Sequence, residues 1–110
     1  MELDTKGNID YNKTMIYKKS LKQWAIIYKG LGNPNRLKIL ELLDEKGRMS
    51  VSIIAEELGI TLKNTSRNLI ILANLDLVES EGKQDRVYYS LNPRLPAEIK
   101  QIIKITLSSN

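Results

Sequence analysis

The chain has 110 residues and a formal net charge of +4, with 17 Lys and Arg against 13 Asp and Glu. It contains no Cys and no His, which excludes thiol redox sensing and leaves soft or borderline metal ions without their usual ligands. No apolar run approaches the length of a membrane span, and the length suits one domain. We therefore expect a single cytoplasmic domain whose modest basic charge is compatible with nucleic-acid binding.

The first part of the chain is predicted to hold a polar arm followed by two helices. Residues 1–12 show little hydrophobic patterning, so we expect a flexible arm there and assign residues 13–110 to the domain. Helical periodicity runs from about Lys13 to Leu31. The pair Asn33-Pro34 supplies an N-cap and a proline at the first helical position, which predicts a second helix ending at about Glu45.

The segment from Ser50 to Leu75 is typical of a helix-turn-helix. Ser50 is a good N-cap for a helix covering about Val51 to Leu58. Gly59 follows where a left-handed residue is least costly without a Cβ, and Thr61 can cap the next helix. Two helices joined within so few residues predict the motif that places its second helix in the major groove of DNA.

This second helix is predicted to expose a polar face. With Thr65 as the inward reference, a step of about 100° per residue also points Leu69 and Leu72 inward. No Asp or Glu occurs between Thr61 and Leu75, although the chain has 13 acids. The outward residues are Lys63, Arg67, Ile70 and Asn74, with Asn64 and Ser66 on the flanks.

Four of these side chains are candidates for contacts with DNA, against the common alternative of a solvated polar face. Lys63 and Arg67 can reach guanine edges or phosphates. Asn64 can pair with adenine, and Ser66 can bond either base. Ile70 leaves three interpretations open: contact with a thymine methyl, packing under the preceding helix, or a tolerated exposed apolar side chain.

A β-hairpin is predicted directly after the helix-turn-helix. Leu77–Glu79 begin an extended run, Gly82–Asp85 form a polar turn, and Arg86–Leu91 return as a run rich in β-formers. Such a hairpin makes a wing, whose tip cations Lys83 and Arg86 would contact the DNA backbone. Because an isolated hairpin is only marginally stable, it should pack on the helices. The residues expected to make that contact are Val78, Val87 and Tyr89.

Three short segments of the chain occur in an order and at spacings that are shared with a known family. They are L-G-N-P-N-R-L-K-I-L at Leu31–Leu40, T-S-R-N-L at Thr65–Leu69 and R-V-Y-Y-S-L at Arg86–Leu91. From Gly30 to Pro93 the chain resembles the ArsR-type winged-helix transcriptional regulators. The resemblance implies a mainly α winged helix-turn-helix fold with about five helices, and a repressor. The residues that it implies face DNA are Lys63, Asn64, Ser66 and Arg67.

The chain departs from that family in its sensing chemistry. Many members sense metals or oxidants through cysteines in the helix before the turn, and this chain has Ser50 and Ser52 in the matching positions. Other members ligate metal with His and carboxylates on the last helix, but this chain has no His. The resemblance therefore implies the fold and DNA binding without a metal site. We expect no cofactor, and the sequence specifies no effector.

Apolar stripes at both ends of the domain predict a homodimer. One stripe lies before Leu31, and the other lies on a last helix that starts near Pro96. A two-fold dimer would present two recognition helices to an inverted repeat, with half-sites about one helical turn apart. The candidate interface residues are Ile16, Trp24, Ile27, Ile99, Ile102 and Ile103.

The leading functional hypothesis is a homodimeric, sequence-specific regulator of transcription that binds double-stranded DNA. The alternative is a winged-helix protein-interaction module that does not bind DNA, with Ile70 and Ile71 on its partner surface. An enzyme is not expected, because a Ser or Lys nucleophile would lack its usual partners and no Gly-rich phosphate loop occurs. We expect no membrane association.

Overall fold

Helices make up most of the structure, a computed structural model that describes residues 19–108. The predicted arm and the candidate interface residue Ile16 lie outside these residues. The described part contains five helices and a three-stranded sheet, as the mainly α winged-helix prediction requires. In chain order the elements are α2 (Leu21–Leu31), α3 (Pro34–Lys46), β1 (Met49–Ser50), α4 (Val51–Leu58), α5 (Leu62–Asn74), β2 (Val78–Lys83), β3 (Arg86–Leu91) and α6 (Ala97–Ser108).

Side-chain caps set where the first two helices begin. Ser20 Oγ accepts from Gln23 N at 3.1 Å, and Gln23 Oε1 accepts from Ser20 N at 2.8 Å, which forms a capping box. Helix α2 therefore starts at Leu21, with Ser20 as its cap. Asn33 Oδ1 accepts from the amides of Asn35 and Arg36, so α3 begins where the sequence predicted.

The core is built from Leu and Ile around α3, which packs against α2, α4, α5, α6 and β3. Because Phe is absent and aromatic residues are few, aliphatic side chains supply nearly all of the buried volume. The largest fully buried apolar side chains are Ile39, Leu40, Leu43, Ile54, Leu69, Leu72, Leu77 and Ile99. These residues come from α3, α4, α5 and α6 and from the residue before β2, so one core joins the helix-turn-helix to the last helix.

The end of α2 lies very close to the end of α5. A Cβ built on Gly30 would stand 2.1 Å from Leu75 Cδ1, so the end of that flexible side chain would have to move. A side chain at Gly30 would therefore displace the tip of Leu75, which packs against this end of α2. This contact brings the end of α2 beside the end of the second helix of the helix-turn-helix.

The sheet is antiparallel with strand order β1-β3-β2. Strand β1 was not predicted; its two residues pair with Tyr89 and Tyr88 of β3. The predicted four-residue turn was too long, because Gly82 and Lys83 belong to β2 and Lys83 pairs with Arg86. The turn itself is the pair Gln84-Asp85, with Gln84 at a φ of 59°.

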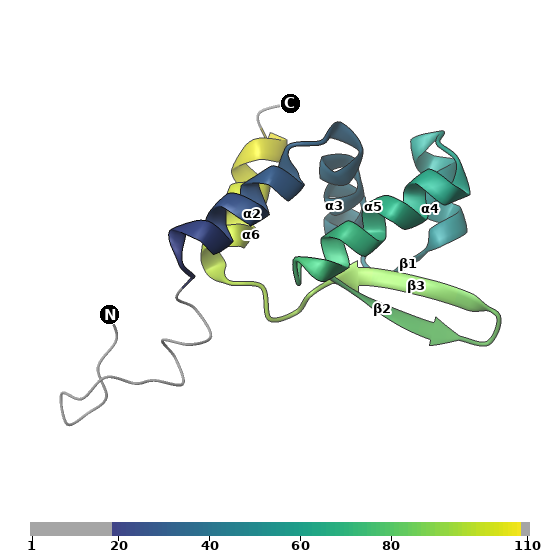
Figure 1. The fold of residues 1–110 in the computed structure, drawn as a ribbon. Helices are drawn as coiled ribbons and strands as arrows, with labels where there is room; N and C mark the ends of the chain where they lie inside the picture. The colour runs from purple at the N-terminus through teal and green to yellow at the C-terminus, as the bar shows by residue number, and fades with distance from the viewer. Residues whose placement is uncertain (1–18, 109–110) are drawn as a thin grey trace, which may run out of the picture.

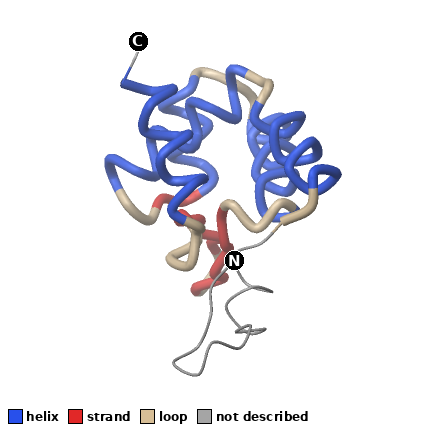
Figure 2. The backbone as a smooth tube through the Cα atoms, turned by 90° about the vertical axis from the view of Figure 1, so that its left-hand side faces the viewer, coloured by secondary structure: helices blue, strands red, loops and turns tan. Residues whose placement is uncertain are grey.

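The wing and the terminal helices occupy different ends of the molecule. In Figure 1, α2 and α6 lie at the end away from the tip of the β2–β3 hairpin, while α4 and α5 lie above the hairpin. The view turned by 90° in Figure 2 also places the strands on one side of the helices. None of the described helices combines the length and hydrophobicity that crossing a bilayer would require.

Candidate nucleic-acid interface

Local hydrogen bonds build the helix-turn-helix as predicted. Ser50 Oγ caps α4 by accepting from Ile53 N at 3.3 Å. Gly59 adopts the left-handed conformation, with φ 67° and ψ 32°, and Ile60 N donates to Ala55 O at 3.2 Å to close the turn. Thr61 Oγ1 then accepts from the third amide of α5 at 3.0 Å. These contacts confirm the predicted bounds of α4 and the start of α5.

The faces of α5 are oriented as the angular mapping predicted. Thr65, Leu69 and Leu72 are fully buried beneath the helix. The residues exposed on its outer side are Lys63, Asn64, Arg67, Ile70 and Asn74. Ser66 is half-buried and lines a hollow of about 260 Å³ between the start of α4, α5 and the wing. The four predicted base-contacting residues therefore come together on one accessible side of α5.

The charge on this side of α5 is available to an anion. Lys63 and Arg67 form no salt bridge with any of residues 19–108. No acid lies on α5 to oppose them. Cations without a carboxylate partner can neutralise phosphates or donate to base edges without first breaking an ion pair.

The wing presents its predicted cations beside the turn. Lys83 and Arg86 are exposed and face each other across the last pair of the β2–β3 ladder. Arg48 supports the hairpin from the loop before β1, with Nη1 3.0 Å from Glu81 Oε2 and its guanidinium carbon 4.8 Å from the Tyr88 ring centroid. One of the acids of the wing is thus paired within the protein.

Two of the three predicted contacts between wing and helices are present. Val78 and Tyr89 are buried in the core, whereas Val87 is 46% exposed. The reason is the strand register. Val87 pairs with Gly82 near the tip of the hairpin, where it lines the hollow shared with α4 and α5 and does not enter the core.

Ile70 is 53% exposed, which excludes burial under α4. Its neighbour Ile71 is also exposed. Contact with a thymine methyl and simple exposure both remain compatible with the position of Ile70.

The sequence reasoning missed Asn68, a buried polar residue of α5 that is 6% exposed. Its Oδ1 accepts from Arg36 Nη1 of α3 at 3.1 Å, and its Nδ2 donates to Asn64 O and Oδ1 at 3.0 and 3.1 Å. The helical angle of Asn68, between the inward and outward faces, was the only signal in the sequence. Its partner Arg36 lies 32 residues away, so local pattern could not reveal the contact.

The predicted dimer residues divide into two groups. Ile27, Ile99 and Ile103 are buried in the core of one chain, where they leave almost no area for a partner. Trp24 and Ile102 are half-buried at its edge. Around them lies exposed apolar surface on α2, with the Trp24 and Tyr28 rings 6.2 Å apart between centroids. A hollow of about 230 Å³ is lined by residues of α2, α3 and α6, including Tyr28 and Ile102.

Ser50 and Ser52, where the resemblance implied that thiols would lie in sensing members, have their hydroxyl oxygens 3.3 Å apart. Among the described residues, no three His, Cys, Asp or Glu side chains gather in a way that could hold a metal ion.

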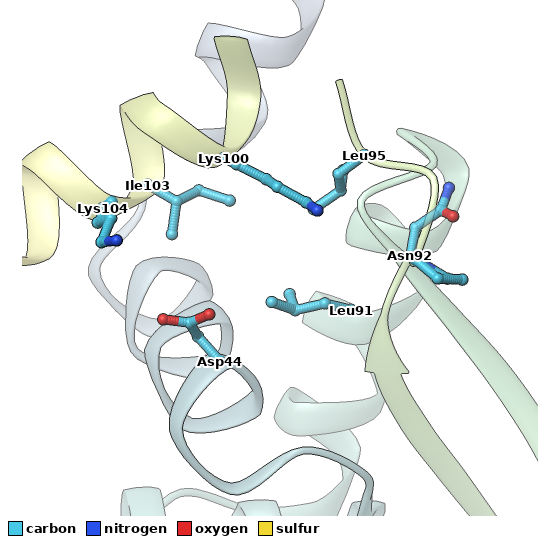
Figure 3. Close-up of a pocket in the computed structure, with 8 residues that line it drawn as sticks. Asp44, Leu91, Asn92, Leu95, Lys100, Ile103 and Lys104 are labelled. Carbon is cyan, nitrogen blue, oxygen red and sulfur yellow. The ribbon is translucent and has the colours of Figure 1, made fainter. Parts of the chain in front are cut away.

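A separate hollow of about 380 Å³ lies between α3, the end of β3 and α6. Figure 3 shows Lys100 and Lys104 projecting from α6 on one side of it, Asp44 on the opposite side, and Leu91 and Ile103 between them. None of its lining residues belongs to α4, α5 or the wing tip, so this hollow is not part of the candidate nucleic-acid interface.

Comparison with known proteins identifies the helix-turn-helix as part of a recognised domain. A family model described as a helix-turn-helix domain matches residues 31–81. The transcriptional repressor SdpR of Bacillus subtilis is 36% identical over 66 residues, covering 60% of this chain and 72% of that protein. The uncharacterized HTH-type transcriptional regulator MJ1325 of Methanocaldococcus jannaschii is 39% identical over 83 residues, covering 74% and 88%.

A solved structure extends the likeness to most of the chain. It is the homodimeric winged helix-turn-helix DNA-binding domain Mb0332 of Mycobacterium bovis, described as a possible ArsR-family transcriptional regulator. The TM-score is 0.69 at 29% identity, with 94% of this chain and 87% of that chain covered. The fold, the helix-turn-helix and these relatives agree: the chain belongs to the ArsR-type family of winged helix-turn-helix transcriptional regulators.

Proposed function

We propose that this protein is a homodimeric, sequence-specific repressor that binds an inverted repeat in double-stranded DNA and acts without catalysis in the cytoplasm. The observation that carries the proposal is the outer side of α5. It gathers two polar side chains and two cations that have no carboxylate partner among residues 19–108, and α5 itself carries no acid. Homology supports it, because SdpR is named a transcriptional repressor and the Mb0332 domain is described as homodimeric and DNA-binding.

In this proposal α5 enters the major groove with its N-terminal half leading. Lys63 and Arg67 donate to base edges or phosphates, and Asn64 and Ser66 contact bases beside them. Lys83 and Arg86 at the wing tip hold the flanking backbone, where contacts position the protein without reading sequence.

The proposed dimer uses α2 and α6. On α2, Leu21, Trp24 and Tyr28 follow one another along one side at helical spacing, and Leu21 and Tyr28 are exposed. Ile102 of α6 lines the same hollow as Tyr28. Association through this surface would cover apolar area that a single chain leaves in water, and it would pair two α5 helices on one duplex.

Salt dependence of binding to a random-sequence duplex tests the DNA-binding part of the proposal. Binding to DNA releases condensed counterions, so the logarithm of the affinity should fall steeply and linearly with the logarithm of salt concentration. Replacing both Lys63 and Arg67 with Gln should make the slope shallower. Flat or absent binding at low salt would instead favour a protein-interaction module, with Ile70 and Ile71 on its partner surface.

A further inference from the structure

A chain of hydrogen bonds connects the end of α2 to a DNA-facing side chain of α5. Arg36 Nε donates to Gly30 O, and Arg36 Nη1 donates to Asn68 Oδ1 at 3.1 Å. Asn68 Nδ2 donates in turn to Asn64 O at 3.0 Å and to Asn64 Oδ1 at 3.1 Å. Asn68 is buried and Asn64 is exposed, so the chain runs from the interior of the protein to its surface.

The direction of these bonds is set by chemistry. A guanidinium can only donate, so Asn68 must turn its oxygen toward Arg36. Its amide nitrogen therefore faces Asn64, where the backbone carbonyl can only accept. The side-chain oxygen of Asn64 must then accept as well. The amide nitrogen of Asn64 takes no part in this chain of hydrogen bonds, and it donates to none of residues 19–108.

We propose that Asn68 is a positioning residue for sequence recognition: held by Arg36, it fixes Asn64 so that its amide nitrogen donates to an acceptor on a base edge. The inference rests on the proposed DNA binding and adds its chemistry. Guanine presents two acceptors, N7 and O6, in the major groove, and it is the base that this arrangement favours. The bidentate pair with adenine expected from the sequence needs the Asn64 oxygen to face the base, and Asn68 already engages that oxygen.

Packing gives the arrangement its rigidity. Arg36 is bonded to Gly30 at one end and to Asn68 at the other, and the absence of a Cβ at Gly30 lets Leu75 pack against the same helix end. Helix α5 is thus held to α3 at its middle, through Asn68, and contacts α2 at its end, through Leu75. A side chain held by partners that are themselves held loses less entropy when it binds a base.

A double-mutant cycle tests whether Asn68 acts through Asn64. Asn68→Asp has nearly the same shape and still accepts from Arg36, but it cannot donate to Asn64. In the wild-type background it should lower the ratio of affinities for a selected operator and a random duplex by about tenfold. In the Asn64→Ala background it should leave that ratio unchanged. Equal losses of the ratio in both backgrounds would overturn the proposal.

The added negative charge needs its own control. Asn74→Asp adds the same charge on the exposed side of the same helix, outside the hydrogen-bond chain. It should weaken binding to operator and random duplex alike and leave their ratio unchanged. A loss of the ratio as large as that of Asn68→Asp would assign the effect to charge and contradict the proposal.

A second measurement needs no change at the buried site. Single operator guanines are replaced with 7-deazaguanine, which lacks the N7 acceptor. At one guanine in each half-site the wild-type protein should lose affinity, whereas exposed Asn64→Ala should lose nothing further there. A guanine bound by Arg67 should instead weaken binding of both proteins. Loss at no position, or the same loss with Asn64→Ala at every position, would overturn the inference while leaving the proposed function intact. Failure of the wild-type protein to bind any duplex would overturn both.

Discussion

Arg67 lies at the centre of the exposed side of α5 and has no carboxylate partner among residues 19–108. Its guanidinium is suited to bidentate contact with a guanine edge. We predict that Arg67→Ala weakens operator binding by about 1–3 kcal/mol and relaxes the base preference at one position of each half-site. Fluorescence anisotropy with the operator and with single-base variants measures both effects.

Lys83 at the wing tip provides the contrast. Lys83→Ala should weaken binding to every duplex by a similar factor. It should also make the slope of log affinity against log salt concentration shallower by about one unit.

An Arg67→Ala protein that keeps full operator affinity would exclude the assigned role of α5. Sequence-selective loss with Lys83→Ala would show that the wing reads bases.

Gly59 adopts a left-handed conformation with open space around its Cα. Its substitution therefore costs backbone strain and causes no clash. Gly59→Ala should lower the free energy of unfolding by about 1 kcal/mol in urea denaturation. Gly82→Ala is the matched control, because Gly82 also has open space but no positive φ, and it should change stability by less than about 0.5 kcal/mol. Equal effects of the two substitutions would contradict this explanation.

At the residue scale, local chemistry was predictable from sequence and distant partners were not. Ser50, Gly59 and Thr61 act on backbone groups within a few residues, and their roles are confirmed. Asn68 depends on Arg36 from another helix, a contact that exists only once α3 and α5 have packed.

Among the elements, α5 depends most directly on its N-cap. Thr61 Oγ1 accepts the amide of Asn64, so the cap also orders the first residues of the proposed DNA contact. Thr61→Ala should lower the free energy of unfolding by about 1 kcal/mol. Thr61→Ser keeps the hydroxyl and should restore most of that stability. Thermal unfolding followed by circular dichroism tests both, and an equally stable Thr61→Ala protein would exclude a role for the cap.

Helices were more predictable than strands, for reasons of length. Each long helix shows several turns of apolar periodicity and a cap, so α3, α4 and α5 could be placed closely. Strand β1 has two residues, too few to show alternation, and Ser50 also serves as the cap of α4. The predicted turn of the wing was too long because Gly82 resembles a turn residue, whereas Gln84 takes the positive φ.

At the scale of the whole molecule, the proposed dimer needs the side of α2 that carries Trp24 and Tyr28. Tyr28→Glu would bury a charge there and should raise the dimer dissociation constant at least about tenfold. Ile26→Glu is the matched control. Ile26 is 50% exposed and Tyr28 54%, but Ile26 lies on the other side of the helix. Sedimentation velocity distinguishes them, and equal dissociation by both variants would place the interface elsewhere.

The sequence predicted apolar helices at both ends of the domain. It did not show which of their apolar residues face a partner chain. Ile27, Ile99 and Ile103 fit the apolar periodicity, yet they fill the core of one chain. Periodicity identifies a buried face without saying whether the chain itself or a second copy covers it.

Selection of bound sequences from a random duplex pool tests the central claim most directly. A homodimer with α5 in the major groove should enrich an inverted repeat whose half-site centres lie about one helical turn apart. Enrichment of a single unrepeated site, or recovery of no sequence above the starting pool, would contradict the proposal of a dimeric, sequence-specific DNA-binding repressor.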